Sequence, residues 1–295
     1  MTVTIRRGFT DISEGQVHYR TISGGVADNK PPILLLHSSP LSSLLMVKFA
    51  THLAEKRDVI ALDTLGQGDS CPPARPDAMM DYFADATVRA LMSLGNKYKQ
   101  VDVFGTHTGA RIAADMAIDH PECVRKVILD GMRRMPSGLY EEYAEKIDMS
   151  RHIDPDGTQF FKAWNKWRDE YLFKPPHRWT QEQATGSPLP SARDMHESAV
   201  EVFKGIPYAH VAYRAAIFYR PQERLPLIKQ PTMVTCGVRD GSFVDLEYSA
   251  NLIPGAIARL HPEGDRVEHS TESGLAELTT MVSDWLDQPS DKARA

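Results

Sequence analysis

The segment with the clearest potential for chemistry is Gly105-Thr106-His107-Thr108-Gly109, which lies between a predicted buried strand and a predicted helix. Small residues two positions before and after the central histidine let a strand and a helix approach closely around a tight turn. A turn of this kind lifts its central side chain above the end of a sheet, where the side chain can meet a substrate. We therefore predict that His107 is the central reactive residue.

Other segments stand where they could complete a site around this turn. His37-Ser38-Ser39-Pro40 follows a predicted buried strand, so the backbone amide of Ser39 could join that of Thr108 in an oxyanion hole. Asp240 follows another predicted strand, and His269 follows the last strand by a loop. The chain order of central residue, acid and histidine is that of the hydrolase triad. We predict these two side chains, with the central histidine, as the catalytic residues.

A histidine at the centre of the turn widens the possible chemistry. Its imidazole could form an acyl-imidazole, act as a base on water, or serve as acid and base in a lyase or isomerase step. Two neighbouring imidazoles cannot both be cationic without a large cost, which favours one neutral and one protonated ring near neutral pH. His107 and His269 are therefore expected to share proton transfer, with Asp240 orienting His269.

The elements that must position these residues alternate along the chain. An N-terminal antiparallel hairpin is followed by apolar runs typical of buried parallel strands. Predicted strands are Ile33 to Leu36, Asp58 to Leu62, Val101 to Phe104, Val124 to Leu129, Thr232 to Cys236 and Ala256 to Leu260. Predicted helices between them are Leu44 to Glu55, Ala78 to Leu94, Ala110 to Ile118, Leu246 to Leu252 and Gly274 to Leu286. This alternation predicts an α/β fold with a mostly parallel sheet of about eight strands and helices on both faces.

The alternation stops over residues 134–219, where helical patterns broken by prolines predict an inserted helical cap. The core domain is accordingly expected at 1–133 and 220–287, with a flexible tail at 288–295. With this order and these motifs, the chain resembles an α/β-hydrolase fold protein with a helical cap. The resemblance implies a site at the carboxyl ends of the strands, with the acid at Asp240 and the base at His269. It departs from the family at position 107, where the pattern has Ser, Cys or Asp.

Four residues are candidate substrate contacts: His37, Trp164, Trp167 and Arg133. Most aromatic residues of the cap are expected to pack against the core, and the remainder could line an apolar pocket for an aromatic or alkyl substrate. Arg133 and Arg134 could anchor a carboxylate or form salt bridges with Glu141 or Glu142. His37 could equally brace its loop by hydrogen bonds.

Composition narrows the class of protein. The 295 residues are 42% hydrophobic and 25% charged with a formal net charge of −5, which is typical of a packed globular chain with no attraction for nucleic acid or anionic membranes. The 3 cysteines are far apart, which favours free thiols over disulfides. No metal-ligand spacing or dinucleotide loop is evident, so we expect no metal and no cofactor. A cytoplasmic monomer or homodimer acting on a small-molecule substrate is the expectation.

These features predict a cofactor-free hydrolase that cleaves an ester, a lactone or a C–C bond next to a ketone in a small apolar or aromatic substrate, using a His-containing variant triad. Three alternatives remain open at this point. The chain could be a lyase, isomerase or oxygenase-like enzyme with a His/Asp base, or a non-catalytic small-molecule binder. It could also be a serine hydrolase whose nucleophile has been replaced.

Overall fold

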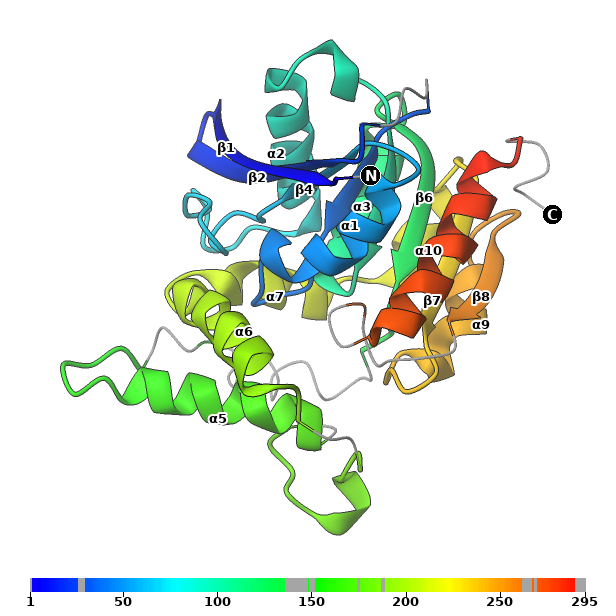
Figure 1. The fold of residues 1–295 in the computed structure, drawn as a ribbon. Coiled ribbons are helices and arrows are strands. Elements are labelled where there is room, and N and C mark those ends of the chain that lie inside the picture. Colours follow the sequence, from blue (N-terminus) through cyan, green and yellow to red (C-terminus); the bar gives the residue numbers. More distant parts are fainter. Residues whose placement is uncertain are drawn as a thin grey trace.

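One sheet organises the chain in the computed structural model, which describes residues 2–25, 30–135, 148, 152–173, 176–186, 189–261, 267 and 270–289. In this described part, eight strands follow the order β1-β2-β4-β3-β5-β6-β7-β8. Figure 1 shows helices packed on the sheet, among them α1 and α10. The first two strands form an antiparallel hairpin that joins β4, and every other pairing is parallel. The predicted α/β fold class is confirmed.

The elements have the following bounds. The strands are β1 (Thr4–Ile12), β2 (Gly15–Ser23), β3 (Ile33–Leu36), β4 (Val59–Leu62), β5 (Val101–Thr106), β6 (Val124–Asp130), β7 (Thr232–Gly237) and β8 (Ile257–His261). The α-helices are α1 (Val47–Ala54), α2 (Met80–Ser93), α3 (Thr108–Asp119), α5 (Thr158–Leu172), α6 (Ala192–Gly205), α7 (Ala209–Phe218), α8 (Pro221–Arg224), α9 (Leu246–Asn251) and α10 (Glu272–Asp287).

The central strands are buried on both faces, which explains why their sequences are continuous apolar runs rather than alternating ones. Side chains of one face, such as Leu34, Val103 and Val127, pack with helices α2, α3, α7 and α9. Those of the other face, such as Leu35 and Phe104, pack with α1 and α10. The carboxyl ends of the parallel strands therefore meet at one rigid edge of the sheet.

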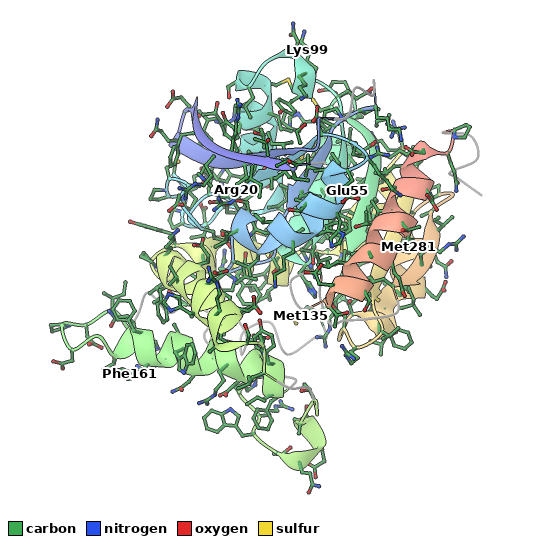
Figure 2. The ribbon with its side chains drawn as sticks, viewed as in Figure 1. Arg20, Glu55, Lys99, Met135, Phe161 and Met281 are labelled. Atoms are coloured by element: carbon green, nitrogen blue, oxygen red, sulfur yellow. The ribbon has the colours of Figure 1, made fainter. Side chains whose placement is uncertain are left out.

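Helices α5 and α6 extend away from the sheet and cover this edge (Figure 1). They share a small apolar cluster of their own, which includes Trp167, Tyr171 and Met195. Phe161 points outward from α5 (Figure 2) and is 73% exposed. In contrast, α7 contributes apolar side chains to the main core against α2 and α3. Within the predicted cap range of 134–219, α5 and α6 therefore pack against each other and α7 packs with the core. The cap and its boundaries stay a prediction.

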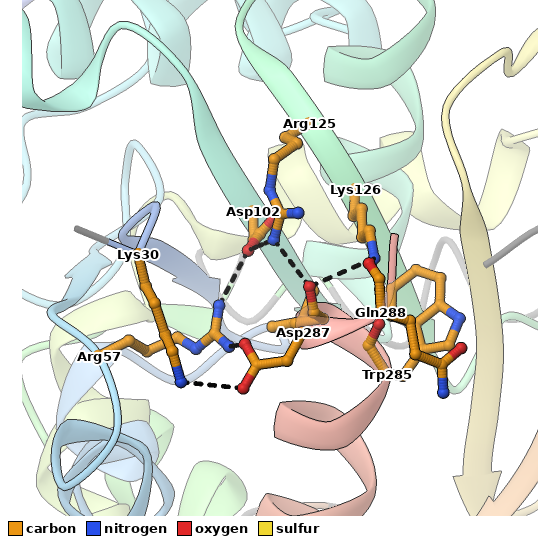
Figure 3. Close-up of polar contacts among 9 residues, drawn as sticks. Lys30, Arg57, Asp102, Arg125, Lys126, Trp285, Asp287 and Gln288 are labelled. Carbon is orange, nitrogen blue, oxygen red and sulfur yellow. Dashed lines mark hydrogen bonds and ion pairs between the residues drawn. The ribbon is translucent and has the colours of Figure 1, made fainter. Parts of the chain in front are cut away.

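An ionic cluster at the opposite edge of the sheet ties down the C-terminal helix (Figure 3). The Arg57 guanidinium bridges the buried carboxylate of Asp102, at 3.1 Å, and that of Asp287 at the end of α10, at 2.5 Å. Lys126 donates to backbone carbonyls at the end of the same helix, including that of Gln288 at 2.6 Å. Cations near the C-terminus of a helix also interact favourably with its dipole.

Gln288 belongs to the predicted flexible tail, of which residues 290–295 lie outside the described part. Among the helices that are described, none is both long and apolar enough to cross a bilayer.

Candidate active site

The turn between β5 and α3 has the strained geometry that the sequence predicts. His107 has φ 50° and ψ −104°. No other non-glycine residue in the described part of the chain has a positive φ. Its amide donates to the carbonyl of Asp130 on β6 at 2.8 Å. A β-carbon at Gly105 would lie 2.1 Å from the carbonyl oxygen of Gly109, and one at Gly109 would lie 2.2 Å from that of Leu36. Only glycine at both positions allows this close passage of strands and helix.

The imidazole of His107 reaches across the sheet edge to the loop after β7. Its Nε2 atom lies 2.7 Å from Oδ2 of Asp240, and the two side chains are 19% and 3% exposed. The other oxygen of Asp240 accepts from the Ser242 amide at 2.7 Å. The acid is therefore held in place by its own loop, and it orients the histidine of the turn directly.

This contact sets the tautomer of the ring when His107 is neutral. An ionised carboxylate only accepts hydrogen bonds, so Nε2 must carry the proton that it donates to Asp240. The Nδ1 atom then has a lone pair, and no partner for Nδ1 is found among the described residues. In a neutral ring, this geometry orients one nitrogen toward a carboxylate and leaves the other available as a base or nucleophile.

The predicted oxyanion loop lies beside the turn. The amide of Ser39 donates to Oγ1 of Thr108 at 3.4 Å, and both residues are buried. Gln67 donates to the Ser39 hydroxyl at 2.9 Å, so the glycine-rich turn after β4 supports this loop. Ser39 and Thr108 are thus brought together next to His107, as the sequence predicts for an oxyanion hole.

A pocket opens above these groups between the sheet edge and the cap. Its volume is about 90 Å³, and its floor includes Ser39, His107 and Thr108. The walls come from α5, α6 and α7 and are largely apolar. Apolar walls with a few polar groups at one end are typical of small-molecule sites.

Four polar side chains of the cap and α7 also line this pocket: Lys166, Glu170, His210 and Tyr213. The ammonium of Lys166 lies 5.6 Å from the centre of the Tyr213 ring. Burial lowers the pKa of Lys166, and the carboxylate of Glu170 partly opposes this effect. His210 Nδ1 lies 3.4 Å from Asp148. A partly desolvated cation therefore lines the same pocket as His107.

The four predicted substrate contacts are placed differently from one another. Trp167 lines the pocket and donates through Nε1 to Ser198 at 2.8 Å. Trp164, on the same helix, is 37% exposed and is not part of the pocket lining. His37 accepts from the Thr64 amide at Nε2 and bonds the Ser38 carbonyl through Nδ1, so it braces the loop that carries Ser39.

Arg133 lies outside the pocket lining, with its guanidinium near Gly241 in the loop of Asp240. The neighbouring Arg134 pairs with Asp245 at 2.7 Å and stacks on Tyr248. Glu141 and Glu142, the partners considered from the sequence, lie outside the described residues. His269 also lies outside them, so its role as a catalytic residue stays a prediction.

Sequence reasoning missed a buried histidine–carboxylate pair beside the site. His261, the last residue of β8, lies 3.3 Å from Asp130 at the end of β6, and both side chains are 1% exposed. Burial, with the Asp130 and Asp240 carboxylates nearby, raises the pKa of the Cys236 thiol to about 12. The sequence does indicate this pair, because His261 and Asp130 each stand at the end of a predicted strand and so lie at the same sheet edge as the site.

His18, Asp63 and Asp69 form the group that most resembles a set of metal ligands in the described part of the chain. Asp63 already accepts from the His18 ring at 2.9 Å and from the amides of Ser43 and Asp69. Burial alone would raise the pKa of Asp63, but these hydrogen bonds hold it well below its usual range. We interpret this group as a structural support of the turn after β4.

The sequence and the fold of this chain were compared with those of known proteins. The family model of the alpha/beta hydrolase fold matches residues 31–261. The chain is 35% identical over 268 residues to a 2-hydroxymuconate semialdehyde hydrolase of Pseudomonas sp. (strain CF600), covering 86% of each chain. Its fold is similar to that of the enol-lactonase from Burkholderia xenovorans LB400, with a TM-score of 0.71, 19% identity and coverage of 95% and 100% of the two chains.

An epoxide hydrolase from an endophytic Streptomyces has the same TM-score of 0.71 at 19% identity, covering 96% of this chain and 95% of its own. Likeness at this identity concerns the fold, whereas the family match spans most of the chain. The family match and the 35% identical relative together show that this chain belongs to the α/β-hydrolase fold family of enzymes.

Proposed function

We propose that this protein hydrolyses an ester, a lactone or a C–C bond next to a ketone in a small substrate, with His107 and Asp240 as its central acid–base pair. The observation that carries the proposal is the 2.7 Å contact between Nε2 of His107, which lines the pocket, and Oδ2 of Asp240 behind it. The named functions of two similar proteins, a semialdehyde hydrolase and an enol-lactonase, lie within this range of reactions.

In the first step, Nδ1 of His107 takes a proton from a water molecule. The water oxygen then forms a bond to the substrate carbonyl carbon, and the carbonyl π electrons move to its oxygen. The imidazolium formed is stabilised by the Asp240 carboxylate at its other nitrogen. The amides of Ser39 and Thr108 donate to the oxyanion, which gains more from these bonds than the neutral carbonyl does.

In the second step, the oxyanion collapses and the bond to the leaving group breaks. The leaving alkoxide or enolate takes the proton from Nδ1 of His107, which restores the neutral ring. The products are a carboxylic acid and an alcohol or ketone, so one water is consumed and no oxidant is needed. We propose that His269 assists as a second proton carrier and that the apolar walls exclude other water.

An alternative covalent route has Nδ1 of His107 attack the carbonyl and form an acyl-imidazole. Water then hydrolyses the acyl group. The two routes give the same products but differ in their intermediate, because only the covalent route places the acyl group on the protein. Acid quenching during turnover, followed by mass spectrometry of the peptide that contains His107, distinguishes them.

The test uses His107→Gln and Asp240→Asn against a panel of activated esters, lactones and ketones with a cleavable C–C bond. Both variants keep the size and polarity of the side chain. We expect turnover to fall by about 10³-fold or more in each, as is typical when a histidine–acid unit is broken. Arg193→Met serves as a control, because Arg193 is an exposed residue of α6 paired with Glu197. Unchanged turnover in both site variants would overturn the proposal.

A further inference from the structure

Arg111, on the first turn of α3, connects two loops of the site by hydrogen bonds. Its side chain donates from one terminal nitrogen to the carbonyl of His107 and from the other to the carbonyl of Arg133, each at 2.8 Å. The residue is 7% exposed and lies four positions after the histidine of the turn. One guanidinium therefore ties the strained turn after β5 to the segment that follows β6.

The charge of Arg111 is not balanced by a direct ion pair. No carboxylate of the described residues lies within 4 Å of its guanidinium, and its Nε atom is buried without a hydrogen-bond partner. Buried charges are costly and are normally paired with an opposite charge. Burial lowers the pKa of Arg111 to about 10, which still leaves the side chain cationic near neutral pH.

Besides burial, which lowers the pKa of Arg111, nearby groups act on it electrostatically: Tyr219, Tyr213 and Asp240 raise this pKa, and the Arg133 guanidinium lowers it. Asp240 is the carboxylate among them, and it forms the 2.7 Å contact with His107. On the pocket side, His107 shares the lining with Lys166, Glu170 and His210. Because its guanidinium donates to the backbone carbonyl of His107 at 2.8 Å, the buried cation lies near enough to act on the His107–Asp240 pair.

We propose that Arg111 is a positioning residue that keeps the His107–Asp240 pair in its negatively charged form, with His107 neutral and ready to accept a proton. A nearby cation stabilises the pair with net charge −1 over the neutral pair that holds an imidazolium. The two hydrogen bonds to backbone carbonyls hold the guanidinium in position for this effect. The inference rests on the proposed function only in assigning His107 as a base.

The experiment follows the protonation of His107 by nuclear magnetic resonance of protein labelled with ¹³C at the histidine ring carbons. His107→Gln identifies the His107 signal by its loss. In Arg111→Met, the pH at which this signal titrates should rise, on the order of one pH unit, because the imidazolium is no longer opposed by a buried cation. Arg111→Gln keeps a donor but loses the charge, and it should show the same rise.

Arg111→Lys keeps the charge and should titrate as the unchanged protein does. The matched control is Arg224→Met, which removes a cation that contacts Asp115 and Asp119 on the same helix α3. It should leave the His107 signal unchanged. Thermal unfolding of every variant shows that the comparison is made on folded protein, and the glutamine variant serves if the methionine variant does not fold.

Two results would overturn the inference. In the first, the His107 signal of the folded uncharged variants titrates at the same pH as in the unchanged protein. In the second, Arg111→Lys shifts the signal as far as Arg111→Met, so that the shape of the guanidinium and not its charge is responsible. Because the signal is read without substrate, a missing hydrolase activity would not produce either result.

Discussion

A β-carbon placed at Gly131 would lie 2.7 Å from Nε2 of His107, the atom that bonds Asp240. Gly131 follows β6 and has φ 71°. The absence of a side chain at this position leaves space for an imidazole that extends from β5 toward the loop after β7. The contact between His107 and Asp240 therefore also depends on the glycine at position 131.

Gly131→Ala should displace the His107 ring and weaken its contact with Asp240. We expect turnover to fall by at least about tenfold, since displacement of a catalytic group by about 1 Å has effects of this size or larger. The measurement is turnover of any substrate that the unchanged enzyme accepts. Gly25→Ala separates strain from displacement, because Gly25 has φ 70° and a β-carbon there would meet nothing within 4 Å. Equal losses in the two variants would mean that strain alone is responsible.

His107→Ser should give little activity on p-nitrophenyl acetate and should abolish the native reaction. A serine hydroxyl is shorter than an imidazole and would leave Asp240 without the contact at 2.7 Å. The remaining site would also be shaped for a longer side chain. Ester turnover of the variant and of the unchanged enzyme is compared at equal concentration. A large gain in ester turnover would instead indicate a serine hydrolase whose nucleophile has been replaced.

Lys166→Met should lower kcat/KM for substrates that carry a negative charge more than for neutral substrates of the same shape. Burial lowers the pKa of Lys166 from its ordinary value of 10.5, so the ammonium loses its proton at a lower pH than a free lysine does. With an anionic substrate, kcat/KM should therefore fall as the pH rises through this lowered pKa. The variant should lack this alkaline decrease.

Glu170→Gln tests the same assignment, because it should shift the alkaline decrease in kcat/KM and not abolish it. The carboxylate of Glu170 raises the pKa of Lys166, so its removal should move the alkaline decrease to still lower pH. A decrease that stays in place in both variants would assign it to a different group.

Arg57→Met should destabilise the fold without touching the site. Arg57 and Asp102 are both 0% exposed, and loss of the guanidinium leaves the buried carboxylate with less compensation. We expect the free energy of unfolding to fall by about 3 kcal/mol, measured by urea denaturation. The exposed pair of Arg193 and Glu197 provides the comparison, since Arg193→Met should cost less than about 1 kcal/mol. The Arg125 guanidinium also lies 2.5 Å from the Asp102 carboxylate. A similar small loss in Arg57→Met would show that Arg125 alone satisfies Asp102.

Much of the sheet could be predicted from the sequence because buried parallel strands are continuous apolar runs. The observed β3, with Ile33 to Leu36, has the predicted bounds, and the remaining central strands differ by one or two residues at their ends. The position of His107 on a strained turn was also predictable, because Gly105 and Gly109 allow the close packing that such a turn requires.

The partner of His107 was not predictable in the same way. Chain order assigns Asp240 to the histidine after the last strand, and this pairing stays a prediction because His269 lies outside the described residues. Chain order gives no sign of the contact between Asp240 and His107 on the turn. Whether an imidazole reaches the loop after β7 depends on the space left at Gly131, which no local pattern reports. Arg111 was missed for a similar reason, since its bonds to two backbone carbonyls exist only after the loops have been brought together.

The bond between the Ser39 amide and the Thr108 hydroxyl has a consequence for the choice of substrate. At 3.4 Å it is near the long limit of an N–H···O bond and is easily exchanged for a better acceptor. In the proposed hydrolysis, an oxygen that gains negative charge would displace the hydroxyl, whereas a weakly accepting ether or alcohol oxygen would not. The Thr108 hydroxyl would then select ligands by the basicity of the oxygen that replaces it at the Ser39 amide, and not by the size of the ligand.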